Sequence, residues 1–458
     1  MARGHGLWYD ELYTAEVAPV PVGRLLSAIL RGEGTISYLS DAPPSYNGPY
    51  YLVTHLWLTV TRLPAEETGL RLLSLVAAVG ALATVTRTVG RLAGPGLATV
   101  AGLVAATNPF VVQYSAEARG YGLALLATAL AALGLARWLD GEPRSLLLYG
   151  VAGAAAGLAH WFAFLVIMSL AVAAVLLRRR QAVGLVVVTA AAALPAAAVI
   201  LLAILNGVGA SGAEWVSDVG GAVPRLLLRS WSGGHTPLLI VTLVAAVSAV
   251  RGVRGVRGVP GRTEARVVAA CWFVFPVAVV TLLELVRPVY VDRYLLPSLL
   301  GLAILMAVGI TRAPRRLVPA ALVVVLGASL WATAAEIRMG PKEDVRGAVA
   351  AVAAGHRPGQ PVVAAARWDA LGVDHYARTD HPQLVPDLVL PPASVPAGPT
   401  VWVVRRAKGG VKGDRKKLEA LDADLTGRGM RITEEQRFGG RYSDTLVQRW
   451  DSVATAGG

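Results

Sequence analysis

AVGLVVVTAAAALPAAAVILLAI, residues 182–204, decides the fold class, because it is apolar throughout and carries no charged side chain. A helix of about 20 such residues is long enough to cross the hydrocarbon core of a bilayer. Similar apolar runs lie near 68–88, 97–114, 120–138, 146–160, 161–177, 237–250, 265–285, 294–311 and 317–335. The sequence therefore predicts an α-helical polytopic membrane domain with about ten spans.

The composition of the 458-residue chain agrees with a membrane protein, since 55% of the residues are hydrophobic, 16% are charged and the mean hydropathy is +0.54. The net charge of +13 does not indicate nucleic acid as a partner, because the arginines stand in short clusters between the apolar runs. The single cysteine, Cys271, excludes an intrachain disulfide. No signal peptide is recognised at the start, so the membrane helices are expected to deliver the external parts.

The arginine clusters predict the orientation of the chain in the plasma membrane. Every second connection is arginine-rich and is assigned to the cytoplasm by the positive-inside rule: Arg87 and Arg91, Arg137 and Arg144, Arg178–Arg180, Arg251 with Arg254 and Arg257, and Arg312 with Arg315 and Arg316. The Arg-Gly-Val repeat at 251–259 is expected to be a flexible cytoplasmic loop. By the same alternation, the other connections, Asp10 and the chain after Met339 are extracytoplasmic.

Two flanking regions differ in character from the apolar core at 66–339. Residues 1–65 mix charged, aromatic and apolar groups, and we expect a first extracytoplasmic loop with amphipathic helices and an acidic motif. Beyond 340, Val-rich runs at 361–366 and 400–404 alternate with helix-like stretches at 345–354 and 416–425. This alternation predicts a small extracytoplasmic α/β domain over 340–458.

Polar residues at the external membrane boundary are the candidates for a functional site. The carboxylates in Leu7-Trp8-Tyr9-Asp10-Glu11 suit a general base, although such acids, taken alone, are more often solvated loop residues. Glu117 and Arg119 stand next to lipid, where they bind a ligand or cap a helix end. His160 is either a buried structural residue or part of a site. Arg293 and its neighbours suit a phosphate or anchor a helix end.

Short motifs follow one another along the chain: Leu7-Trp8-Tyr9-Asp10-Glu11, Asp41-Ala42-Pro43-Pro44, Leu70-Arg71-Leu72-Leu73-Ser74, Asn108-Pro109, Tyr114-Ser115-Ala116-Glu117-Ala118-Arg119-Gly120-Tyr121, Ala159-His160-Trp161 and Asp292-Arg293-Tyr294-Leu295. In this order they resemble landmarks of the GT-C glycosyltransferases, in the branch related to family 39. That branch includes the dolichyl-phosphate-mannose protein mannosyltransferases and the Rgt-type lipopolysaccharide transferases. The resemblance covers residues 7 to about 335.

The resemblance implies an inverting transferase that moves a sugar from a polyprenyl-phosphate donor to a cell-envelope glycan, lipid or protein on the extracytoplasmic face. Asp10 would be the general base, and Glu11 would orient the acceptor or help to hold a divalent metal ion, whose presence stays open. Arg119 would act at the donor phosphate or hold Asp10, and Arg293 would neutralise the leaving phosphate. The other residues expected in this cavity are Glu117, Tyr121, His160 and Tyr294.

The resemblance has one departure and two competing interpretations. The family has a transmembrane helix before the acidic motif, whereas nine residues precede Asp10 here, so we expect that this helix is missing or that the true start lies upstream. A multispan lipid or glycolipid transporter or flippase is the main alternative. A scaffold protein whose tail binds partners is another. The one-sided polar residues and the lack of a visible internal repeat favour the enzyme.

Overall fold

The amino-terminal residues and the carboxyl-terminal domain belong to one structural unit, although the helical core lies between them in sequence. The computed structural model describes residues 5–142, 144–207, 216, 218–251, 262–407 and 414–452. Unit 1 contains Met1–Pro44, Tyr51–Leu70 and Met339–Gly458, and unit 2 contains Ser45–Tyr50 and Arg71–Arg338. Apart from Arg251, the Arg-Gly-Val repeat lies outside the described residues.

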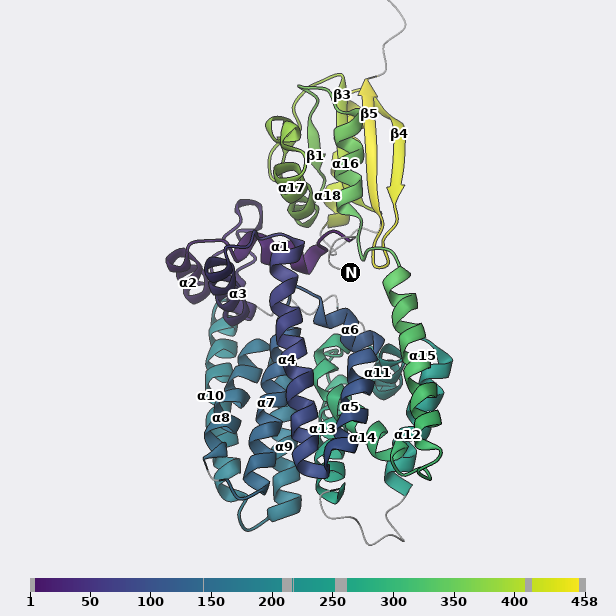
Figure 1. The fold of residues 1–458 in the computed structure, drawn as a ribbon. Helices are drawn as coiled ribbons and strands as arrows, with labels where there is room; N and C mark the ends of the chain where they lie inside the picture. Colours follow the sequence, from purple (N-terminus) through teal and green to yellow (C-terminus); the bar gives the residue numbers. More distant parts are fainter. Residues whose placement is uncertain are drawn as a thin grey trace, which may run out of the picture. The chain divides into compact units, whose positions relative to one another are not determined.

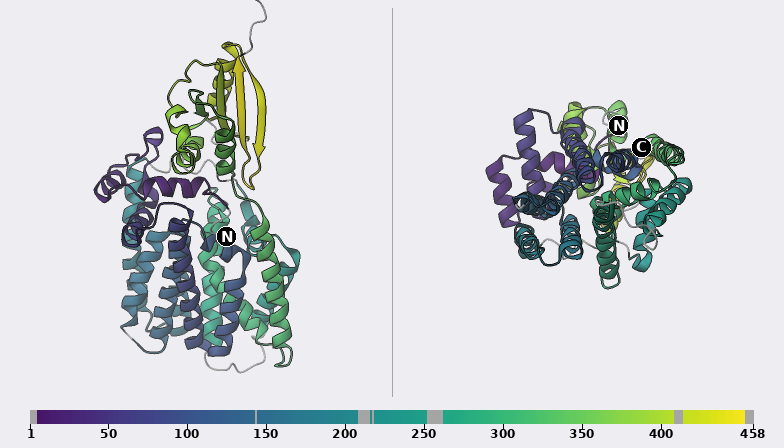
Figure 2. Two further views of the ribbon diagram at one scale, coloured as in Figure 1. Left: turned by 45° about the horizontal axis from the view of Figure 1, so that its top comes forward. Right: turned by 60° about the horizontal axis from the view of Figure 1, so that its bottom comes forward.

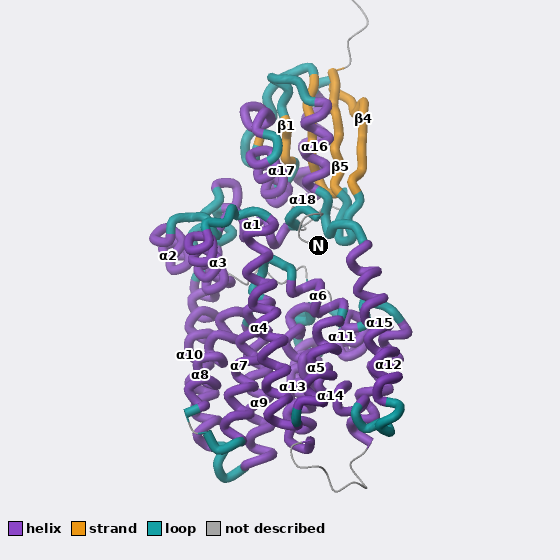
Figure 3. The backbone as a smooth tube through the Cα atoms, viewed as in Figure 1, coloured by secondary structure: helices purple, strands orange, loops and turns teal. Residues whose placement is uncertain are grey.

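Unit 2 is a bundle of apolar helices (Figures 1 and 3). Among the described residues, seven helices are long and apolar enough to cross a membrane, and two bent pairs raise the number to nine. The prediction of about ten spans exceeds this number because Ser145–Ala159 has 15 residues, which is short for a span. The predicted polytopic α-helical architecture is confirmed.

The helices of this part of the chain are α4 (Glu67–Ala93), α5 (Pro95–Thr107), α6 (Pro109–Ser115), α7 (Tyr121–Leu139), α8 (Ser145–Ala159), α9 (Phe164–Arg178), α10 (Val183–Leu205), α11 (Val223–Trp231), α12 (Thr236–Arg251), α13 (Arg262–Glu284), α14 (Leu299–Ile310) and α15 (Val318–Arg338). Short 3-10 turns lie at η3 (Trp161–Ala163), η4 (Gly220–Ala222) and η5 (Asp292–Ser298).

The bend between α5 and α6 is made by Asn108 and Pro109. The two helices meet at 66°. The Asn108 Oδ1 accepts hydrogen bonds from two backbone N–H groups in the first turn of α6, at 3.0 and 3.2 Å, and its Nδ2 donates to the Trp231 carbonyl at 2.8 Å. Pro109 cannot continue α5 but fits the first turn of a new helix. This local chemistry ends α5 and starts the short helix that leads to Glu117.

Unit 1 begins with the helices of the predicted first loop. They are α1 (Tyr9–Val17), α2 (Val22–Arg31), η1 (Ser37–Leu39) and the start of η2 (Pro44–Asn47), and part of α3 (Gly48–Thr61) belongs to the same unit. In α2, Leu25 and Ile29 are buried while Leu26 and Leu30 are exposed, next to charged residues at both ends of the helix. This helix therefore has one buried apolar face, while the assignment of residues 1–65 to a first extracytoplasmic loop with amphipathic helices stays a prediction.

The rest of unit 1 is the α/β domain, which confirms the predicted class of the tail. Its sheet has the order β2-β1-β3-β5-β4; β1 is parallel to β2 and β3, whereas β5 is antiparallel to β3 and β4 (Figures 1 and 2). The strands are β1 (Val362–Ala364), β2 (Leu388–Val389), β3 (Thr400–Arg406), β4 (Met430–Phe438) and β5 (Thr445–Ser452), and the helices are α16 (Val345–Gly355), α17 (Arg367–Thr379) and α18 (Asp414–Gly427).

Candidate functional site

Two arginines predicted from the external connections lie among tyrosines in unit 2. Arg119 is buried, and its Nη2 donates to the Tyr46 hydroxyl at 2.7 Å, with the guanidinium carbon 5.8 Å from the centroid of the same ring. Arg293 Nε donates to the Tyr121 hydroxyl at 2.9 Å, and its guanidinium carbon lies 5.8 Å from the Tyr294 ring centroid. Each cation is therefore oriented by a phenol.

His160 lies close to both arginines, in the turn between α8 and η3. Its ring centroid is 4.6 Å from that of Tyr294 and 5.6 Å from that of Tyr121. Burial lowers the pKa of His160 to about 3, and the positive charges of Arg119 and Arg293 add to the decrease. The imidazole is thus neutral near pH 7. We name Tyr46, Arg119, Tyr121, His160, Arg293 and Tyr294 the arginine cluster.

A glycine makes the close approach within the cluster possible. A Cβ on Gly120 would collide with the carbonyl oxygen of Ala159, the residue before His160. The Ser74 hydroxyl donates to the Arg119 carbonyl at 3.1 Å and fixes the same turn from α4. Motifs that are far apart in the sequence, around Ser74, Arg119 and His160, therefore meet at one place.

The turns on either side of the cluster contain two further acids. Glu117 is buried, and its carbonyl accepts the Arg119 N–H at 2.8 Å. The Asp292 Oδ1 accepts the Arg293 N–H at 2.7 Å, and Oδ2 accepts a hydrogen bond from the Ser230 hydroxyl at 2.9 Å. Asp292 thus connects η5 to α11 and fixes the backbone that carries Arg293.

Sequence reasoning missed Tyr46 and Ser230. The only signal for Tyr46 is its position two residues after Pro44, within a predicted external loop, where an aromatic residue can as well be an interfacial anchor. Ser230 lies in a segment with no motif. Both were missed because a hydroxyl partner is recognised by its place in the fold and not by its neighbours in sequence.

The arginine cluster has the chemistry of an anion site. Guanidinium groups bind phosphate through directed, charge-assisted hydrogen bonds, and the phenols keep them in place. A neutral imidazole adds a hydrogen-bonding group without a further charge.

The predicted acidic pair lies in unit 1, at the start of α1. The Glu11 side chain is fully buried, and its Oε2 accepts the Trp8 N–H at 3.4 Å, so it closes the first turn of its own helix. Asp10 is partly exposed, and its carbonyl accepts the Thr14 hydroxyl at 3.1 Å. The acidic pair and the arginine cluster are thus carried by different units.

The sequence left open a divalent metal ion near Glu11. Within the part of the chain that the structure describes, no three His, Cys, Asp or Glu side chains are grouped so that they could hold a metal ion. The described residues around Glu11 therefore do not offer such a ligand set.

Comparisons with known proteins identify the fold. No protein-family model and no curated protein matches the sequence. The structure of ArnT from Cupriavidus metallidurans bound to undecaprenyl phosphate is 14% identical, and the match covers 100% of this chain and 96% of that chain with a TM-score of 0.57. The structure of the same ArnT in the apo state is 13% identical, and the match covers 97% of this chain and 94% of that chain with a TM-score of 0.55. The chain has the GT-C fold.

The predicted GT-C fold is confirmed, whereas membership of the GT-C glycosyltransferases and of their branch related to family 39 stays a prediction. A structure of the Archaeoglobus fulgidus oligosaccharyltransferase in the apo form is 12% identical and covers 85% of this chain and 61% of that chain. The TM-score of this match is 0.48.

Proposed function

We propose that the chain is an integral membrane glycosyltransferase that uses a polyprenyl-phosphate-linked sugar as donor. The observation that carries the proposal is the arginine cluster, in which the Tyr46 and Tyr121 hydroxyls orient Arg119 and Arg293, and the rings of Tyr121 and Tyr294 both pack against His160. The GT-C fold supports it, since the ArnT structure of the same fold contains undecaprenyl phosphate. The acceptor is a glycan, lipid or protein of the cell envelope, and the reaction takes place on the extracytoplasmic face.

In the proposed reaction, Asp10 removes the proton from the acceptor hydroxyl, and the acceptor oxygen attacks the anomeric carbon of the donor. The bond between that carbon and the phosphate oxygen breaks, with inversion, and the electron pair leaves with the polyprenyl phosphate. Negative charge grows on this leaving group, and preorganised cations stabilise it best in a site that contains little water. Arg119 and Arg293 supply these cations.

The remaining site residues have supporting roles in the proposal. Glu11 holds the turn that presents Asp10, in keeping with its hydrogen bond to Trp8. Tyr121 and Tyr294 orient Arg293, and His160 separates the aromatic rings without adding charge. Glu117 is proposed to shape the turn before Arg119.

The test of the proposed base is Asp10→Asn in the full-length protein. Loss of a general base costs about 10²- to 10⁴-fold in rate, so sugar transfer from undecaprenyl-phosphate-linked donors should fall by that factor. Thermal unfolding and the binding of undecaprenyl phosphate should stay as in the unchanged protein. Asp424→Asn, at an exposed acid of α18, is the matched control and should keep full transfer.

Full transfer by folded Asp10→Asn protein would exclude Asp10 as the base. If the unchanged protein transfers none of the sugars but moves labelled lipid between leaflets of a vesicle, the flippase alternative replaces the transferase.

A further inference from the structure

Cations of the α/β domain cover both aromatic rings that precede Asp10. The Lys342 Nζ lies 4.2 Å from the centroid of the Trp8 ring, and the Arg406 guanidinium carbon lies 4.5 Å from the centroid of the Tyr9 ring. On α17, Trp368 packs against the same tyrosine with 4.8 Å between ring centroids. The amino-terminal motif is thus held by residues from the other end of the chain.

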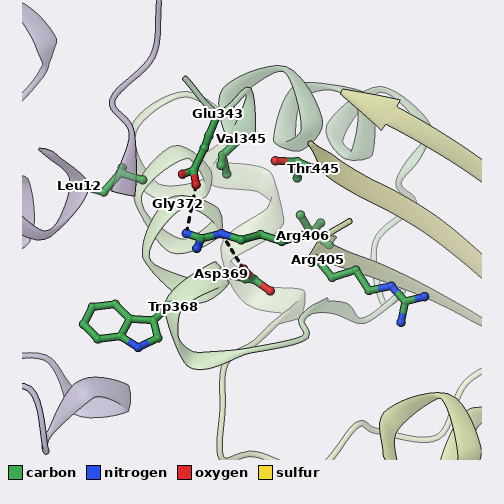
Figure 4. A pocket seen from close by; sticks show the side chains of 10 residues that line it. Leu12, Glu343, Val345, Trp368, Asp369, Gly372, Arg405, Arg406 and Thr445 are labelled. Atoms are coloured by element: carbon green, nitrogen blue, oxygen red, sulfur yellow. Dashed lines mark ion pairs between the residues drawn. The ribbon is translucent and has the colours of Figure 1, made fainter. Parts of the chain in front are cut away.

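Arg406 is the centre of a network of charged residues next to Tyr9. Its guanidinium pairs with Glu343 at 3.5 Å and with Asp369 at 3.4 Å, as the dashed lines in Figure 4 show. The Glu343 carboxylate is buried and accepts the Tyr9 N–H at 3.4 Å. One arginine therefore contacts the Tyr9 ring directly and the Tyr9 backbone through Glu343.

The charge of Asp10 reaches this network. Burial raises the pKa of the Glu343 carboxyl group, and the negative charge of Asp10 raises it further. The positive charge of Arg406 and the hydrogen bond from the Tyr9 N–H oppose this rise. Lys342, the preceding residue, also opposes it. Asp10 and Glu343 thus interact as like charges across the contact between α1 and the domain, with Arg406 as the compensating cation.

Packing along the rest of α1 fits the same arrangement. A pocket beside Leu12 is lined by α17 and β3 of the domain (Figure 4). A Cβ on Gly372 of α17 would lie 3.2 Å from Leu12 Cδ1 and 2.5 Å from Val345 Cγ1, so only glycine allows this approach. Near the end of α1, Glu16 Oε1 lies 3.1 Å from His375 Nδ1. The contacts therefore run along the whole helix.

We propose that the α/β domain supports α1 and holds the acidic motif, Asp10 and Glu11, in the position that transfer requires. Arg406 is the central positioning residue of this support. Arg406 acts through Tyr9 and Glu343 and does not touch the reacting atoms. The part of the inference that concerns the rate of transfer rests on the proposed function, whereas the support of α1 does not.

Arg406→Gln tests the support, with Arg405→Gln as the matched control. Arg405 is the neighbouring residue on β3, pairs with Asp422 of α18 at 2.9 Å, and extends away from Arg406 in Figure 4. The two substitutions remove the same charge from the same strand, but only one removes a contact to α1. Both are made in the full-length protein in lipid nanodiscs.

The first readout is hydrogen exchange of the backbone amides in 9–17. Exchange there should rise about tenfold in Arg406→Gln and stay within about twofold in Arg405→Gln. The second readout is sugar transfer, where kcat should fall about tenfold in Arg406→Gln without an increase in the KM for the donor. Arg406→Lys, which keeps a cation over Tyr9, should restore part of both values.

Unchanged exchange in folded Arg406→Gln protein would overturn the support role, and so would an equal increase in both variants. If Arg406→Gln unfolds the domain, Tyr9→Leu removes the ring from α1 and leaves the ion pairs of the domain in place; unchanged exchange there overturns the proposal as well. Suppose that exchange increases in Arg406→Gln alone and that the unchanged protein transfers no sugar. This result would confirm that the α/β domain holds α1 and would contradict only the proposed transferase function.

Discussion

At the residue scale, Arg293 is the arginine whose removal should affect donor binding most directly. Arg293→Gln removes one of two cations of the arginine cluster and leaves the Tyr121 hydroxyl in place. Hydrogen bonds to charged groups contribute about 1.5–3 kcal/mol, so the affinity for undecaprenyl phosphate should fall roughly ten- to hundredfold. Titration of the lipid phosphate against the purified protein measures the change.

Arg287 provides the control for this prediction. It is an exposed arginine in the same connection between α13 and η5, so Arg287→Gln removes the same charge outside the cluster. Its affinity for undecaprenyl phosphate should stay within about twofold of the original. An equal loss in both variants would show that general positive charge, rather than the cluster, attracts the lipid.

The alternation of arginine-rich connections predicts that Arg119, His160 and Arg293 lie on the same side of the membrane. Their pairing with particular hydroxyls could not be predicted, because Tyr46 and Tyr121 reach the arginines from other segments of the chain. The burial of Glu11 and its hydrogen bond to the Trp8 N–H could not be predicted either. The sequence alone does not show whether an acidic side chain faces solvent or the first turn of its own helix.

At the element scale, Glu16 should make the attachment of α1 dependent on pH. Its two oxygens contact His375 at 3.1 Å and Arg378 at 2.7 Å. Although burial opposes the change, these partners lower the pKa of Glu16 below its usual 4.5. A carboxylate with a lowered pKa stabilises the folded state above its unfolded pKa, and this contribution is lost as the pH falls through the folded pKa.

Glu16→Gln should therefore reduce the stability of unit 1 by about 1.5–3 kcal/mol at pH 7, and its effect should disappear as the pH falls through the lowered pKa of Glu16. Thermal unfolding of the full-length protein at several pH values measures this difference. Glu33→Gln, at an exposed acid that follows α2, should change neither the midpoint nor its pH dependence. A loss of stability in Glu16→Gln that stays the same from pH 7 down to the most acidic pH at which the protein is folded would contradict the role of its charge.

The elements of the tail show why some strands are predictable and others are not. The Val-rich strands β1 and β3 are buried on the inside of the sheet, and their composition indicated them. The strand β4 is an edge strand whose residues from Arg431 to Arg437 are exposed and mostly charged, so it carries no apolar pattern. Charges on an edge prevent pairing with other chains, and they also hide the strand from sequence reasoning.

At the scale of the whole molecule, the orientation in the membrane is the prediction to test. In a Cys271→Ala background, single cysteines at Thr263, which follows the Arg-Gly-Val repeat, and at Glu434 on β4 should be labelled from opposite sides of the membrane. An impermeant maleimide added to intact cells and then to lysed cells distinguishes the two sides. The Cys271→Ala protein without further cysteines is the control and should stay unlabelled.

Labelling of both positions from the same side would overturn the orientation and, with it, the extracytoplasmic location proposed for the α/β domain. The polytopic fold could be predicted from hydropathy alone, because each span is a local property of about 20 residues. The association of α1 with the α/β domain could not, because its contacts join residues at opposite ends of the chain, such as Tyr9 and Arg406.

The contacts of Trp8 with Lys342 and of Tyr9 with Arg406 also bear on when the folded protein is completed during synthesis. The acidic motif leaves the ribosome before the α/β domain does, and β3, which carries Arg406, pairs with β5 near residue 450. Because domains fold as their last elements emerge, the acidic motif obtains its partners only after the membrane helices between them have been translated. Until β5 has been translated, the nascent protein therefore has its membrane helices but not the complete domain that surrounds Trp8 and Tyr9.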